Sequence, residues 1–99
     1  MSWTVQIKLT RPNTDTVWYT MGDSDKTYFQ TNFADTGKRT SYTVEGKEGL
    51  EKTTTIVYAN QTALNEFLAD SKYQTFRTAK INHNTSNSIS RTLLFNGST

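Results

Sequence analysis

The chain opens with a regular alternation of apolar and polar positions. Residues 3–9, WTVQIKL, place a large apolar side chain at every second position, which predicts a strand with one buried face. Pro12 and Asn13 favour a turn directly afterwards. Residues 15–21, DTVWYTM, are rich in β-branched and aromatic residues. They therefore predict either an extra N-terminal strand or a lead into a helix, and the pattern leaves both alternatives open.

Helical spacing replaces alternation in the next segment. Residues 22–24 interrupt the apolar run and offer a helix cap, and Gly37 suits the position just past a helix end. Between them, the aromatic residues of DKTYFQTNFADT fall roughly on one helical face. We therefore predict a helix over residues 25–36.

The middle of the chain returns to strands and then to a broken helix. Residues 38–45 alternate, 46–49 read as a hairpin loop, and 50–59 are dense in β-branched residues, so two strands are predicted. A helix should follow from Asn60 or Thr62, with apolar residues spaced i, i+3 and i+4. It should break at residues 70–71, where Ser71 and Gln74 form a capping box for a second helical piece.

The last part of the chain reads as a loop followed by a closing strand. Residues 82–88 are polar throughout and predict the loop, and residues 89–95 alternate and predict the strand. The complete order predicts an α+β fold of the ferredoxin-like kind: a split β-α-β sandwich whose antiparallel sheet carries two helices on one face. A length of 99 residues corresponds to one domain, residues 1–99.

Composition excludes several kinds of chemistry. There is no cysteine, so disulfides, thiolate nucleophiles and thiolate-bound metals are excluded, and His83 is the single histidine. We therefore predict no cofactor and no metal site. Only 33% of residues are hydrophobic, which leaves a modest core and favours oligomerisation. The Thr- and Asn-rich, cysteine-free composition is typical of a small phage or viral protein.

Charge is distributed unevenly along the chain. Residues 1–70 hold seven Lys/Arg and nine Asp/Glu, whereas residues 71–99 hold four Lys/Arg and no acid. A basic C-terminal third suits either a solvated helix face or an anionic partner. The N-terminus lacks the continuous apolar run of a signal peptide, and no stretch is long enough to span a membrane. The expected location is the cytoplasm.

Residues 50–76 resemble the dimeric α+β barrel superfamily, especially the antibiotic-biosynthesis-monooxygenase-like group. The resemblance lies in a strand, a turn and a helix with an Ala-Leu-x-x-Phe-Leu core, a break and an aromatic second turn, here ALNEFLADSKY at residues 63–73. It implies a homodimer joined through the sheet faces and a pocket between sheet and helices. Some members are cofactor-independent monooxygenases of aromatic substrates. Others degrade haem.

The resemblance singles out two positions. The tryptophan and histidine of haem-degrading members fall on Tyr58 and Arg77, and the first strand here lacks their asparagine. An arginine offers no lone pair to iron, so we do not expect haem degradation. Tyr58 is instead a candidate to hydrogen-bond a phenol or carbonyl, and Arg77 a candidate to hold an anionic oxygen. The alternative is that Tyr58 is a core aromatic and Arg77 is solvated.

His83 completes the set of candidate ligand-binding residues. Its side chain alone has an ordinary pKa near neutrality, but its predicted place in a polar loop, without a neighbouring carboxylate, favours an exposed and non-catalytic role. No catalytic motif is recognised, so catalysis stays undecided.

The sequence favours binding of a small aromatic or anionic ligand in a sheet–helix pocket. The alternatives are a non-catalytic protein-interaction or accessory module and a cofactor-independent monooxygenase. Nucleic-acid binding is disfavoured, because residues 52–59 lack stacking aromatics in the positions that need them.

Overall fold

A computed structural model describes all 99 residues. Its four strands are β1 (Trp3–Thr10), β2 (Arg39–Glu45), β3 (Glu51–Tyr58) and β4 (Ser90–Ser98). They form one sheet in the order β2-β3-β1-β4, and every neighbouring pair is antiparallel. This order separates β1 from β2 by β3, and β3 from β4 by β1, as two interleaved split β-α-β units require. The predicted ferredoxin-like α+β fold is confirmed.

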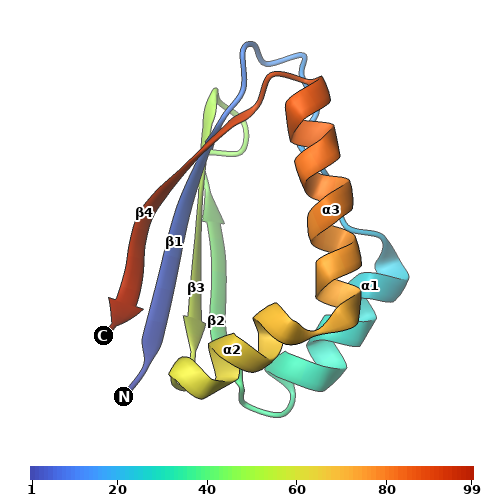
Figure 1. Ribbon diagram of the computed structural model, residues 1–99. Helices are drawn as coiled ribbons and strands as arrows, with labels where there is room; N and C mark the ends of the chain where they lie inside the picture. The colour runs from blue at the N-terminus through green and yellow to red at the C-terminus, as the bar shows by residue number, and fades with distance from the viewer.

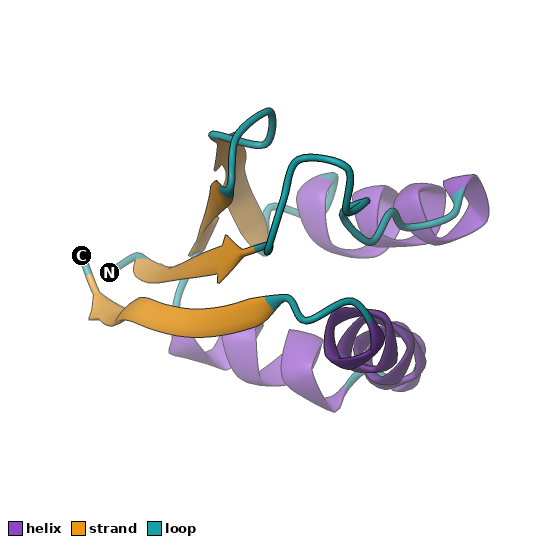
Figure 2. Cartoon of the chain, turned by 90° about the horizontal axis from the view of Figure 1, so that it is seen from above, coloured by secondary structure: helices purple, strands orange, loops and turns teal.

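The helices lie on one side of the sheet. They are α1 (Asp23–Phe29), which continues into a π-helical turn η1 (Gln30–Ala34), then α2 (Gln61–Ala69) and α3 (Ser71–Ser86). Figure 1 shows α3 running along the length of the sheet, with α1 and α2 gathered at its lower end. Figure 2, from above, shows all helices on the same side of the strands and the two termini close together. None of these helices is long and apolar enough to cross a membrane.

The core sits where α1, η1 and α2 meet the lower half of the sheet. We call it the aromatic core; its six buried residues are Phe29, Phe33, Tyr58, Ala63, Leu64 and Phe67. The first-strand alternation is the reason the sheet can close over it, because Trp3 and Val5 pack against this cluster from β1. Aromatic side chains dominate, with neighbouring ring centroids 5.1 Å apart for Phe33 and Phe67 and 5.5 Å apart for Phe29 and Phe67.

Side-chain caps explain the broken helix. Asn60 accepts a hydrogen bond from the Ala63 backbone N–H at the start of α2, and Asp70 does the same for Tyr73 at the start of α3. The predicted break at residues 70–71 is confirmed, although Asp70, and not Ser71, supplies the cap.

The structure decides one open alternative and corrects one expectation. Residues 11–22 form a loop that leads into α1, so residues 15–21 are the lead into a helix and not the extra strand. Most of the predicted loop at residues 82–88 is the last part of α3, which continues to Ser86. Weak helix propensity is overridden there by tertiary contacts, because the His83 Nε2 atom lies 2.7 Å from the Val17 carbonyl oxygen.

Candidate anion-binding site

Two cations flank a buried leucine on the helix-covered face of the sheet. Leu9 of β1 is buried, and it pairs with Lys52 of β3 and with Arg91 of β4. Residues directly opposite each other in neighbouring strands point to the same side. Lys52 and Arg91 therefore both face the helices, at the end of the sheet away from the aromatic core.

Helix α3 brings a third and a fourth cation to the same place. Lys80 is half-buried, and burial together with the charges of Arg91, Lys52 and Arg77 lowers its pKa. We call Lys52, Arg77, Lys80 and Arg91 the basic cluster. Lys52 and Lys80 are half-buried, whereas Arg77 and Arg91 are exposed, so the cluster opens towards solvent.

The basic cluster has no carboxylate partner. The ion pairs of the protein join Lys8 to Glu51, Lys38 to Glu66 and Lys72 to Asp25, and none includes a member of the cluster. The half-buried Lys52 has its pKa lowered by burial and by two further cations, Arg11 and Lys47, and its Nζ lies 4.9 Å from the ring centroid of Trp18. Like charges held together without a counter-charge cost free energy that a bound anion would recover.

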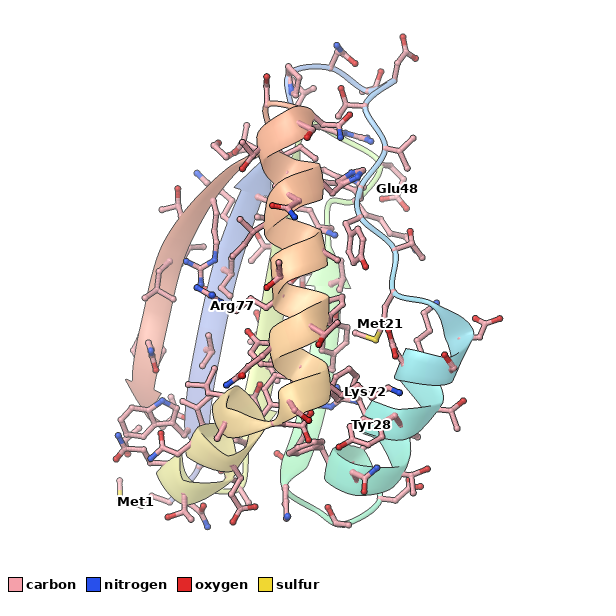
Figure 3. All side chains as sticks on the ribbon, turned by 45° about the vertical axis from the view of Figure 1, so that its right-hand side comes forward. Met1, Met21, Tyr28, Glu48, Lys72 and Arg77 are labelled. Atoms are coloured by element: carbon pink, nitrogen blue, oxygen red, sulfur yellow. The ribbon has the colours of Figure 1, made fainter.

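An open groove runs beside Arg77. Its volume is about 490 Å³, and it is lined by Leu68, Tyr73, Gln74, Arg77 and Thr78. Burial raises the pKa of Tyr73, and the charges of Arg77 and Arg91 oppose that shift. Figure 3 shows Arg77 on the side of α3 towards β1 and β4. The groove therefore sets one guanidinium group, that of Arg77, beside the apolar and aromatic side chains of Leu68 and Tyr73, and the other three members of the cluster do not line it.

The layer between α3 and the sheet is spanned by side chains, since the α3 backbone makes few close approaches to the strands. Phe76, one turn before Lys80, is only half-buried, and Leu93 on the facing strand is 47% exposed. One turn after Lys80, the buried Asn84 Oδ1 atom has no hydrogen-bond partner. Unpaired buried polar atoms are uncommon in folded proteins. This part of the layer therefore contains both a polar atom without a hydrogen-bond partner and cations without a carboxylate partner.

A second groove, which also borders α2, has a different character. It measures about 280 Å³ and lies between residues 36–38 and the start of α2. Its cation, Lys38, already contacts Glu66 across 2.8 Å. The local charge is therefore neutralised within the chain, which makes this groove the weaker candidate for an anion.

The three residues singled out from the sequence lie in different surroundings. Tyr58 is 2% exposed in the aromatic core, with its ring centroid 5.7 Å from that of Phe67, and burial raises its pKa. Arg77 lines the groove beside the basic cluster. His83 lies in α3, where its ring contacts Tyr19 at 5.6 Å. The structure thus places only Arg77 at the candidate site.

Sequence reasoning missed Lys52, Lys80 and Arg91. A signal was available for two of them, because Lys80 and Arg91 belong to the acid-free stretch 71–99. Lys52 carried no such signal, since only the strand register brings it level with Arg91. No group of three or more His, Asp or Glu side chains comes together to hold a metal ion.

Comparisons with known proteins add little to this geometry. No family model matches the chain. No curated protein matches it. Among solved structures, Rv0793 from Mycobacterium tuberculosis aligns over 94% of this chain and 93% of its own, at 16% identity and a TM-score of 0.42. A likeness of that size carries no argument about function.

Proposed function

We propose that the protein binds a small organic anion between α3 and β4, through Arg77, Lys80 and Arg91. The observation that carries the proposal is a basic cluster without any carboxylate partner, next to an open groove. Arginine side chains hold a carboxylate or phosphate through a planar fork of donors. The half-buried rings of Tyr73 and Phe76 supply an apolar wall for the body of an aromatic acid.

Titration calorimetry with matched probes tests this proposal. Benzoate and benzyl alcohol share an aromatic body but differ in charge, and inorganic phosphate supplies charge without the ring. We expect benzoate to bind more tightly than either, and Arg91→Gln or Arg77→Gln to weaken it about tenfold each, the value of one charged contact. Equal binding of benzyl alcohol, or unchanged affinity in both variants, would contradict the proposal.

Arg39→Gln is the matched control. Arg39 lies on β2, the opposite edge of the sheet, with its guanidinium carbon 5.3 Å from the Tyr42 ring centroid. It changes net charge by the same amount as the test variants without touching the cluster. If it weakens benzoate equally, the binding reflects overall charge and not a site.

We further propose that the chain works as a homodimer of the monooxygenase-like kind, joined through the open face of the sheet. Element order supports this relationship. The face itself is polar: Gln6 Nε2 donates to Thr55 Oγ1 across 3.1 Å, and Lys8 pairs with Glu51 across 3.0 Å. A dimer held by such a face should be weak and sensitive to salt, which light scattering at two ionic strengths tests directly.

The alternative function is a protein-interaction module that uses β4. This edge strand exposes three consecutive large apolar residues, Leu93, Leu94 and Phe95, at 47%, 46% and 43%. Unpaired edges with apolar side chains are templates for another chain. Native mass spectrometry of the purified protein discriminates the two: a small retained adduct favours the anion site, and a stoichiometric protein partner favours the edge.

A further inference from the structure

β4 is the less protected of the two edge strands of the sheet. It is nine residues long and pairs only with β1, so the backbone groups along its other side have no partner strand. Its sequence, SRTLLFNGS, contains no proline, and Arg91 is its single charged residue. The opposite edge, β2, carries a charge at each end, Arg39 and Glu45. Charged side chains are a common means of preventing sheet edges from pairing, and β4 has one only near its start.

The apolar side chains of β4 reach both faces of the sheet. Leu93 pairs with Ile7 and Phe95 with Gln6, so the register shifts between them and Leu94 has no counterpart in β1, as in a β-bulge. Leu93 therefore follows the helix-covered face with Ile7, and Phe95 follows the open face with Gln6. The exposed fractions of Leu93, Leu94 and Phe95 are 47%, 46% and 43%. A strip of apolar surface thus runs around the edge of the sheet.

The Phe95 ring is already ordered against its own strand. A Cβ atom at Gly97 would lie 3.3 Å from the Cζ atom of Phe95, so the ring covers the glycine. It occupies space that any larger side chain at position 97 would fill. Because the ring is held in place before association, a partner that packs on it has little side-chain entropy left to remove.

We infer that β4 pairs antiparallel with β4 of a second copy of this chain, so that the two sheets join edge to edge. The inference rests on the alternative function, which uses β4, and names its partner; it is independent of the anion site. A two-fold axis near Leu94 makes the contact self-complementary and sets Arg91 of each copy opposite Gly97 of the other. The two arginines are then about 20 Å apart along the paired strands, well beyond the ~8 Å range of charges at physiological salt.

The exposed apolar area predicts a weak dimer. A large apolar side chain offers about 150–250 Å², so the exposed parts of these three side chains from each copy would together bury about 500 Å². Stable complexes bury about 1,200–2,000 Å². Main-chain hydrogen bonds between the strands add affinity, although the bulge at Leu94 interrupts them. We therefore expect monomer and dimer to exchange at concentrations between about 10 µM and 1 mM.

Sedimentation equilibrium over that concentration range, at two ionic strengths, tests the inference. We expect a reversible dimer that higher salt does not weaken, because the contact is apolar. Leu94→Lys should weaken it at least about tenfold, since the axis brings the two lysines together, and circular dichroism verifies that the variant folds. Tyr42→Lys is the matched control: Tyr42 is 54% exposed on the other edge strand, and the variant adds the same charge there.

Each possible result decides the inference. A monomer at every concentration overturns it, and it overturns the use of β4 as well only if native mass spectrometry finds no other protein bound to the chain. A dimer that survives Leu94→Lys and dissociates as salt rises is joined through the open face, so it also overturns the edge contact. A dimer that Tyr42→Lys weakens equally reflects added charge and not β4. Loss of the dimer in Leu94→Lys alone supports the inference.

Discussion

The two ends of the layer between sheet and helices are built on opposite principles. In the aromatic core, Phe29, Phe33 and Phe67 are buried against one another and against α2, so every surface finds a partner within the chain. At the other end, the basic cluster is half-buried or exposed and meets no acid. One end is complete as folded. The other is arranged so that an anion from outside would complete it.

The difference between the two ends is tested most directly by replacing one phenylalanine at each end with alanine. Phe67 is 8% exposed and contacts four other rings, including Tyr73 at 4.3 Å, so Phe67→Ala should lower the free energy of unfolding by about 3–5 kcal/mol. Phe76→Ala should cost less than half as much, because that ring is half-exposed. Denaturant unfolding of both variants measures the difference, and equal losses would remove the distinction between the two ends.

Arg11 shows what a satisfied buried cation looks like. It is 7% exposed, and its guanidinium donates to four backbone carbonyl oxygens, those of Thr16, Lys47, Glu48 and Gly49. Arg11→Met should lower stability by about 1–3 kcal/mol, because four backbone carbonyl oxygens lose their donor. Thermal unfolding against the half-buried control Arg39→Met measures this loss. A variant as stable as the wild type would mean that the hydrogen bonds of Arg11 do not stabilise the fold.

The start of α3 is held in place by Asp70, which bonds both to α3 and to α1. The Asp70 carboxylate caps the Tyr73 N–H at 2.9 Å and accepts from the Tyr28 hydroxyl at 2.6 Å; Figure 3 places Tyr28 beside the base of α3. Asp70→Ala should cost about 1 kcal/mol, and Asp70→Asn much less, because an asparagine still caps the helix. Chemical denaturation checks the pair. If benzoate affinity falls in Asp70→Ala, the position of α3 also controls the basic cluster.

The smallest expected change in the free energy of unfolding is for a Lys80 variant, and it is a gain and not a loss. Lys80→Met should raise the free energy of unfolding by up to about 1 kcal/mol near neutral pH, since it removes a half-buried charge from among like charges. The same variant should lose benzoate affinity, so stability and binding should move in opposite directions.

The pH dependence of that gain follows from the lowered pKa of Lys80. Between its folded pKa and 10.5, the unfolded state holds more protons on this lysine than the folded state does. Unfolding free energy therefore rises with pH in that window, and the advantage of Lys80→Met should shrink. The difference between variant and wild type must be measured, because the raised tyrosine pKa values lower stability in the same range. A constant difference would contradict the lowered pKa.

The sequence by itself determined the succession of strands and helices. The alternation in residues 3–9 and the capped break at Asp70 are local signals, and each acts within a few residues. The sequence also showed that residues 71–99 hold four Lys/Arg and no acid. It misjudged residues 82–88, because a polar segment carries no local sign that tertiary contacts will hold it helical.

Only the tertiary structure decided where the candidate site lies. Lys52 and Arg91 are 39 positions apart in the chain, and they share a level because both pair with Leu9. Tyr58, a candidate ligand-binding residue from the sequence, is buried in the aromatic core. Lys80 is half-buried because it lies on the face of α3 that points to the sheet. Strand register and helix phase arise from packing over the whole sheet. A charge cluster assembled from three separate elements is therefore visible only after folding.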